Sequence, residues 1–259
     1  MKALIYFVLF YLLTVSIPSR AASSVLVWPI YQVIDADQHG SALWLENRGA
    51  SRVSLQVRVL SWKQQNQTES YADQSTVVAS PPFATVEPGK RQLIRLIRTG
   101  PVSAGTENAF RIIIDEIPSG APAYGESHNG VKLQMRYLLP LFLNGEGIWT
   151  RERSDLKLTT SQISQPVLSW RTVTLRGKTY LSVRNEGRVH ARLSNVFWGS
   201  SSNPDTATLT LSRGFLGYVL PGESMQWLLP DGKSVPGGKQ QLYAQLADNH
   251  PAKPVRQAE

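Results

Sequence analysis

Strict alternation of apolar and polar residues runs through residues 131–137, and it limits the possible folds more than any other stretch of this chain. The apolar members, all on one side of an extended chain, are Val131, Leu133, Met135 and Tyr137. A period of two is typical of a strand with one buried face and one wet face. Pro140 follows closely, and proline is tolerated at a sheet edge but not in a central strand. We therefore predict a long edge strand that carries a row of large apolar side chains.

An exposed edge of this kind promotes aggregation unless another strand is meant to pair with it. We therefore hypothesise that this strand pairs with a separate protein. The alternative is that the four apolar side chains fill the core of their own domain, because the inward residues of any strand show the same pattern.

Before this stretch the chain consists of short segments with strand-like alternation, and none up to Trp149 has helical periodicity of useful length. The expected strands lie within residues 25–35, 42–46, 53–60, 77–78, 92–97 and 110–114. We expect a turn at residues 47–50 and a polar loop over residues 63–75. Seven short strands in about 125 residues favour an immunoglobulin-like sandwich.

The second half of the chain repeats the β character without repeating the sequence. Residues 144–147 (Asn-Gly-Glu-Gly) and the polar run 151–165 are typical of a connection between domains. We predict an all-β protein of two immunoglobulin-like β-sandwich domains. The expected divisions are a signal peptide at 1–21, a first domain at 22–146, a hinge at 147–165, a second domain at 166–248 and a polar, mobile tail at 249–259.

The first residues have the pattern of a secretion signal. A positive start at Lys2 precedes an apolar run from Ala3 to Ile17, and small residues surround Arg20. About fifteen apolar residues fall short of the roughly twenty that span a membrane. We expect a cleaved signal and no membrane span afterwards; the alternative is an uncleaved anchor.

Composition argues against several classes of function. The formal net charge is +8 and there is no cysteine. The basic residues are scattered along strands, whereas nucleic-acid binders gather them on one face or helix. Four distant histidines form no short zinc-binding spacing, and adjacent Asp115 and Glu116 point to opposite faces of a strand. We therefore expect no enzyme, no cofactor, no metal and no nucleic-acid partner.

Several short motifs, in this order, resemble a known family. They are Trp28-Pro-Ile-Tyr31, Ser80-Pro-Pro82, residues 87–96 (EPGKRQLIRL), residues 110–118 (FRIIIDEIP) and residues 134–142 (QMRYLLPLF). Together they are similar to the periplasmic pilus-assembly chaperones of chaperone–usher systems, in the PapD-like superfamily and closest to its archaic, Csu-like branch. The resemblance is strong in the first domain and looser in the second.

The resemblance implies two domains in an L and a location in the periplasm. It also implies that the seventh strand of the first domain is lent to an incomplete pilus subunit, which is later delivered to an outer-membrane usher; such donor-strand complementation is a known form of strand addition. On this basis Val131, Leu133 and Met135 are the donated side chains, with Tyr137 continuing the row.

The chain departs from the better-known branch in the cleft between the domains. The family's Arg and Lys that grip a client carboxylate fall at or near residues 30–31 and at Pro140, which are not basic. We take Arg95 and Arg136, expected on strands beside the donor row, as candidate replacements. Glu116 matches a family acid that holds the domains together, but Asn144 replaces the basic partner expected near it.

Another class of protein fits the same β pattern, namely a secreted structural protein such as an adhesin or a pilus component. A pilus subunit should carry an alternating extension before its first strand. Here the strand pattern begins within a few residues of Ala21, which favours the chaperone.

Overall fold

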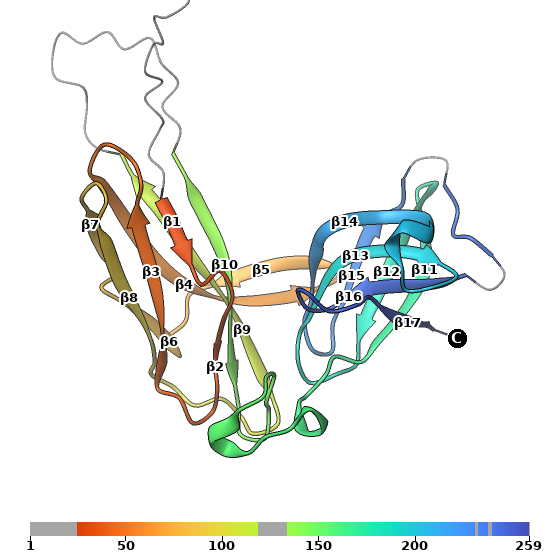
Figure 1. Cartoon of the computed structure of the whole chain (residues 1–259), viewed down its shortest axis with the longest axis horizontal. Coiled ribbons are helices and arrows are strands. Elements are labelled where there is room, and N and C mark those ends of the chain that lie inside the picture. The colour runs from red at the N-terminus through yellow and green to blue at the C-terminus, as the bar shows by residue number, and fades with distance from the viewer. Residues whose placement is uncertain (1–24, 119–133, 231–232, 238–239, 259) are drawn as a thin grey trace, which may run out of the picture.

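The computed structural model describes residues 25–118, 134–230, 233–237 and 240–258. They form two β-sandwich domains that lie at an angle to each other and are joined at one end (Figure 1). In the first domain the strands are β1 (Val25–Trp28), β2 (Gln32–Ile34), β3 (Gly40–Asn47), β4 (Val53–Gln65), β5 (Thr68–Ala72), β6 (Val77–Ser80), β7 (Phe83–Val86), β8 (Arg91–Arg98), β9 (Glu107–Ile117) and β10 (Arg136–Asn144).

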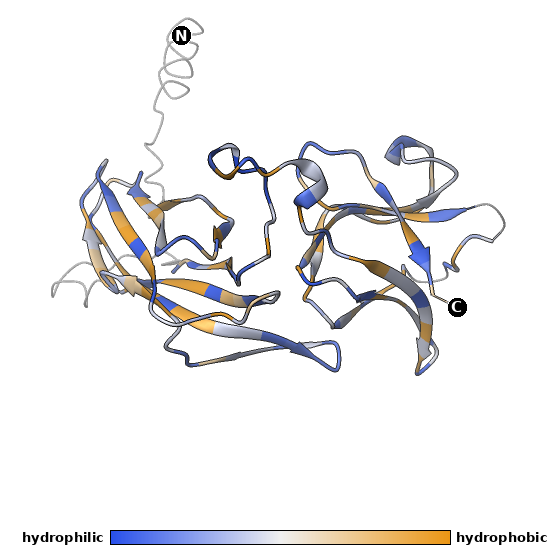
Figure 2. Cartoon of the chain, turned by 90° about the horizontal axis from the view of Figure 1, so that it is seen from below, coloured by the Kyte–Doolittle hydropathy of each residue, from blue (hydrophilic) through white to orange (hydrophobic). Residues whose placement is uncertain are grey.

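Two sheets form the first domain, one ordered β1-β3-β8-β6 and the other β2-β10-β9-β4-β5, with β7 paired to β4. The inward residues of both sheets make one apolar core, which includes Leu43, Leu55, Ile94, Ile112 and Leu141. Hydrophobic and hydrophilic residues alternate along these strands (Figure 2). The predicted all-β, immunoglobulin-like class is confirmed.

The segment expected as a single strand at residues 25–35 forms two strands in different sheets. β1 runs antiparallel to β3, whereas β2 runs parallel to β10. Pro29 lies between them and has no N–H to continue a ladder, so the chain can leave the first sheet here. As a result, each sheet receives an edge strand from the same segment.

The polar stretch at residues 63–75, expected as a loop, is mostly a hairpin. β4 continues to Gln65 and pairs with β5 as far as Thr68. The two turn residues, Asn66 and Gln67, both have positive φ, as two-residue hairpin turns of type I′ require. The two-residue turn therefore makes a hairpin of a polar stretch that was expected to be a loop. This hairpin extends toward the second domain (Figure 1).

Of the expected edge strand at residues 131–137, the structure describes residues 134–137. β10 begins at Arg136 and continues through Pro140 to Asn144. Val131 and Leu133 lie outside the described residues. The strand can contain Pro140 because the nitrogen of this residue faces away from the neighbouring strand β9.

The linker and the second domain contain the remaining elements. These are the 3₁₀ turns η1 (Ser154–Leu156) and η2 (Thr160–Gln162), strands β11 (Leu168–Leu175), β12 (Lys178–Asn185) and β13 (Ala191–Gly199), the turn η3 (Pro204–Thr206), and strands β14 (Ala207–Val219), β15 (Ser224–Leu228), β16 (Gln241–Gln245) and β17 (Lys253–Gln257). Their hydrogen-bonded order is β14-β13-β16-β17-β11-β12-β15. None of the helical turns in the described part of the chain could cross a membrane.

The tail from residue 249 was expected to be mobile, but it contains a strand. β17 pairs with β16 on one side and with the start of β11 on the other. Val255 is buried in the core, and its carbonyl accepts a hydrogen bond from Trp170 Nε1 at 3.1 Å. One apolar side chain among polar neighbours was too weak a signal to predict a strand, since only the gap between β11 and β16 makes it one.

Candidate functional site

The first part of strand β10 has a β-sheet partner on one side only. β10 pairs with β9 from Arg136 to Asn144, but with β2 only at residues 141–143. Within the described strands, residues 136–140 therefore have one unpaired backbone edge. Such an edge is a template for a further strand.

The phase of the ladder explains how Pro140 fits into this strand. The carbonyl of Met135 accepts a hydrogen bond from the Glu116 N–H at 3.1 Å. In an antiparallel pair, successive residues alternate between facing the partner and facing away from it. Pro140, five residues later, therefore faces away from β9, so its missing N–H costs no ladder bond. By the same alternation, the backbone N–H groups of Arg136 and Leu138 point toward the open side.

A row of inward apolar side chains along β10 passes from full burial to exposure. Leu143 and Leu141 are fully buried and Leu139 nearly so. Tyr137 is half-buried against the core, and Met135 is 43% exposed. The core of the first domain therefore ends partway along this strand, and its apolar row continues into the open edge.

Strand β1 lies on the other side of this opening. It pairs with β3 alone, and the Val25 carbonyl accepts a hydrogen bond from Tyr137 Oη at 2.8 Å. Burial raises the pKa of the Tyr137 phenol, which keeps it protonated as a donor. Leu26 and Leu138 are both exposed beside the opening, at 37% and 44%. Two unpaired edges and exposed apolar side chains thus occur together at one place.

The candidate anchor Arg136 is already engaged by a carboxylate of its own domain. Arg136 forms an ion pair with Asp115, which also accepts a bond from Arg58 Nη2 at 2.8 Å. Partial burial would raise the pKa of Asp115, but the hydrogen bonds from Arg136 and Arg58 outweigh it and hold that pKa below its usual value. Arg136 therefore lies at the open edge with its Nε bound to Asp115, and the remaining donors of its guanidinium can still reach another carboxylate.

Arg95 does not lie where the sequence suggested. It belongs to β8 in the other sheet, opposite Ala42 of β3 and Ser80 of β6. The expectation that Arg95 and Arg136 both lie beside the donor row is therefore wrong for Arg95. An alternating strand fixes which face a side chain is on, but not which sheet the strand joins.

The acid that connects the domains is Glu107 and not Glu116. Glu116 lies opposite Leu55 of β4, near the start of β10. Glu107 is nine residues earlier on β9, so at about 3.3 Å per residue it lies roughly 30 Å away, at the other end of the strand. There its buried carboxylate contacts His190 of the second domain, with Oε2 2.9 Å from Nδ1.

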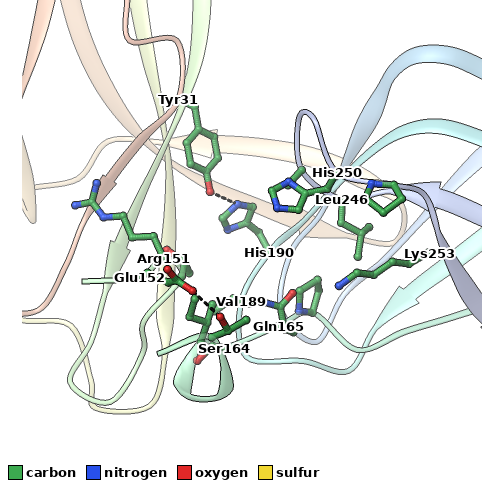
Figure 3. Close-up of a pocket in the computed structure, with 16 residues that line it drawn as sticks. Tyr31, Arg151, Glu152, Ser164, Gln165, Val189, His190, Leu246, His250 and Lys253 are labelled. Carbon is green, nitrogen blue, oxygen red and sulfur yellow. Dashed lines mark hydrogen bonds between the residues drawn. The ribbon is translucent and has the colours of Figure 1, made fainter. Parts of the chain in front are cut away.

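His190 is the centre of the contact between the domains. Its backbone N–H donates to Glu107 Oε1 at 2.8 Å, its Nε2 is 2.7 Å from Tyr31 Oη (Figure 3), and its ring stacks on Phe142 with centroids 3.4 Å apart. Burial and the nearby Glu107 carboxylate strongly raise the pKa of Tyr31. Tyr31 and Phe142 belong to the motifs quoted above, but Glu107 and His190 belong to none of them. The four residues are far apart in the sequence, which is why sequence reasoning missed this contact.

A second contact between the domains is built by the β4–β5 hairpin. The Gln64 side chain donates to the Tyr218 carbonyl at 3.0 Å and accepts from the Leu220 N–H at 2.8 Å. The Arg111 guanidinium lies 3.6 Å from the centre of the Trp62 ring, which meets Tyr218 edge-on. Cation–π contacts of this kind are worth more when desolvated. The interface is thus polar and aromatic, with its hydrogen bonds directed at fixed backbone groups.

The linker is tied to the first domain by Asp35, whose side chain is fully buried. It accepts hydrogen bonds from Asn144 Nδ2 at 3.0 Å and from Arg151 and Arg153 at 3.2 Å each. From the sequence, Asn144 was expected to stand in place of a basic partner of Glu116 at the interface between the domains. In the structure it supports the linker instead. The segment predicted as a hinge is anchored by charge to the first domain.

A cavity of about 470 Å³ lies between the domains beside His190. Its walls include Tyr31, Arg151, His250 and Lys253 (Figure 3). Within the described residues, no group of three His, Cys, Asp or Glu side chains could hold a metal ion. The features found so far define a class of two-domain β-sandwich proteins with a firm interface between domains and an open strand edge in the first.

Comparison with known proteins shows what this chain is similar to. Residues 30–148 match the family model of the pili and flagellar-assembly chaperone, PapD N-terminal domain. The probable fimbrial chaperone SfmC of Escherichia coli K12 is 26% identical over 141 residues, which cover 54% of this chain and 58% of that protein. Residues 30–148, which make up most of the first domain, are therefore similar to the N-terminal domain of the PapD-like pilus-assembly chaperones.

Solved structures extend the likeness to both domains. The CsuC–CsuE chaperone and tip-subunit complex from the archaic Csu pili of Acinetobacter baumannii matches 91% of this chain and 100% of the solved chain, with 28% identity and a TM-score of 0.72. The SafB chaperone complex with the SafA pilin of Salmonella enterica matches 91% of this chain at 16% identity, with a TM-score of 0.57, which shows the fold alone. The resemblance predicted from the sequence motifs is confirmed.

Proposed function

We propose that this protein is a periplasmic chaperone that binds pilus or fimbrial subunits at the open edge between β10 and β1, and delivers them to an outer-membrane usher. The observation that carries the proposal is the apolar row of β10, which is buried at residues 139–143 and exposed at Met135. A subunit that lacks one of its own strands would find there both backbone partners and apolar side chains.

Burial of the exposed row provides the binding free energy. Transferring one such side chain from water to an apolar site contributes roughly 1.5–3 kcal/mol. If Val131, Leu133 and Met135 are donated together, the gain is on the order of 5–9 kcal/mol before the costs of ordering and association are subtracted. An affinity in this range holds a subunit and still permits its transfer to another strand donor.

The interface between the domains supports this function by fixing the cleft. The contacts of Glu107 with His190 and of Gln64 with Tyr218 hold the second domain at a set angle to the open edge. A client that pairs with β10 then meets a preformed surface, which lowers the ordering cost of binding. Arg136 is the candidate to bind a client carboxylate at this edge, through the guanidinium donors that Asp115 does not occupy.

The test compares two substitutions of equally exposed apolar residues. Met135→Asp places a charge in the donor row, whereas Leu228→Asp does the same on β15 of the second domain, where the leucine is 42% exposed. Each variant is co-expressed in the periplasm with a pilus subunit of the same gene cluster, and the chaperone–subunit complex is purified and quantified.

We expect the Met135→Asp protein to lose most of the complex and the Leu228→Asp protein to retain it. Circular dichroism and thermal unfolding verify that both variants are folded. Equal recovery of the complex with Met135→Asp and with the unaltered protein would show that β10 is not the binding edge.

A further inference from the structure

The outer face of the β1-β3-β8-β6 sheet is unusually apolar for a surface. We call it the Trp-Arg face; its members are Leu26, Trp28, Trp44, Arg91, Leu93 and Arg95. The solvent face of an antiparallel sandwich normally carries polar residues. Here the sheet register places Trp28 opposite Trp44, and Trp44 opposite Leu93, in one row across three strands. The two indole rings stack with centroids 6.3 Å apart.

The charges on this face are unevenly neutralised. Glu46 accepts hydrogen bonds from Arg48 at 3.1 Å and from Arg91 at 2.9 Å, and the bond from Arg48 lowers its pKa. Arg91 also covers the Trp28 ring at 5.3 Å. The acid of this region is therefore already satisfied by its own domain.

Arg95 is different from its neighbours. Of the described arginines in the first domain, it is the one for which the structure shows no ion pair, hydrogen bond or ring contact; its cross-strand neighbours are Ala42 and Ser80. It is exposed, and Leu93 lies two residues before it on the same face. An unneutralised guanidinium among apolar side chains is complementary to a carboxylate that is itself flanked by apolar groups.

The Trp-Arg face is continuous with the open edge. Leu26 and Trp28 belong to β1, whose free side borders the opening where Tyr137 bonds to Val25. A strand added to the free side of β1 would place alternate side chains on the same outer face, next to Leu26 and Trp28. Whatever occupies the edge is therefore positioned to cover part of this face.

We infer that the bound pilus subunit extends over β1 and covers the Trp-Arg face with apolar side chains, and that a subunit carboxylate pairs with Arg95. The inference rests on the proposed function and identifies a second contact for the same client. It assigns to Arg95 a role on the sheet face, away from the cleft between the domains.

The test measures the affinity of the full mature chaperone for the co-expressed pilus subunit, by competition with unaltered chaperone. Arg95→Glu is expected to weaken the complex about tenfold or more, since a like charge then opposes the client carboxylate. Arg95→Lys should retain affinity within about threefold, because it keeps the positive charge. The matched control is Arg52→Glu, an exposed arginine of the same domain with one long ion pair to Glu87, and it should have little effect.

The outcomes separate this inference from the proposed function. If Met135→Asp abolishes binding but Arg95→Glu does not weaken it, the inference is wrong and the proposed function stands. If neither variant weakens binding, both are wrong. If the Arg95→Glu complex forms normally but is no longer captured by the detergent-solubilised usher, the face serves the usher, and the inference is likewise overturned.

Discussion

The two domains differ in how completely their last strand is paired with neighbouring strands. In the second domain, the C-terminal strand β17 fills the gap between β16 and β11 and buries Val255. In the first domain, the last strand β10 is enclosed only over residues 141–143, and its other end is left open beside β1. Two similar folds thus differ in completeness. The second domain buries its last large apolar residue, whereas the first leaves the end of an apolar row exposed at Met135.

The difference teaches that the open edge is a local property of one strand and not a general weakness of the fold. The second domain shows that this chain can close a sheet with a short and mostly polar segment. The first domain has a comparable apolar core, yet the row along β10 extends beyond it. An exposed apolar edge costs solubility unless it is used.

The largest expected effect comes from disrupting the packing of strand β17 in the second domain. Val255→Asp would bury a carboxylate without a partner, which we expect to destabilise the second domain by about 3–5 kcal/mol. Urea unfolding followed by tryptophan fluorescence measures the change. Lys253→Asp, on the same strand but exposed, is the control and should have a much smaller effect. An unchanged midpoint for Val255→Asp would mean that β17 is not part of the folded sheet.

The next effect in size concerns the connection between the two domains. Glu107→Gln keeps the size of the side chain but removes the charge that faces His190, and we expect a loss of about 1–3 kcal/mol. Glu116→Gln, at the far end of the same strand, should leave the interface intact. Small-angle X-ray scattering and urea unfolding report the angle and the coupling of the domains. A larger loosening from Glu116→Gln would restore the assignment made from the sequence.

The smallest expected effect is electrostatic and lies at the open end of β10. The pKa of Asp115 is lower in the folded protein than its ordinary value of 3.8, so its ion pairs stabilise the fold at higher pH. This contribution is lost as the pH falls through the lowered pKa, because the carboxylate is then protonated. At pH 7, Asp115→Asn should therefore lower stability by less than about 1 kcal/mol, since such pairs are partly exposed.

The pH dependence provides the check. The stability difference between Asp115→Asn and the unaltered protein should shrink as the pH is lowered below about 4. Unfolding midpoints measured at pH 7, 5 and 3 are sufficient. A difference that stays constant over this range would show that Asp115 acts through packing and not through its charge.

Much of the first domain could be predicted from local pattern. The alternation at residues 53–59 and 110–114 predicts strands that the structure places in the core, and the turn at residues 47–50 separates β3 from β4 as expected. The local pattern fails to predict strands where a polar segment pairs with a neighbouring strand. Residues 63–75 are polar but form a hairpin, and the polar tail forms β17, because in both cases a neighbouring strand supplies the partner.

The site shows the same division. The alternation of apolar residues by itself indicated an edge at the start of β10, and the described residues Met135 and Tyr137 lie there. It could not place Arg95 in the opposite sheet, nor select Glu107 over Glu116 as the acid between the domains. Both acids lie on β9, and only the position of the second domain distinguishes them.

The sequence by itself determined the all-β class, the two domains and the resemblance to the PapD-like pilus chaperones, because each depends on periodicity and motifs within short stretches of chain. Only the tertiary structure decided which edge is closed and which is open, and which charges meet. These features join residues far apart in the chain, such as Glu107 with His190 and Trp170 with Val255. Local alternation defines the faces of a strand, but the partner of each edge is chosen by the packing of the whole chain.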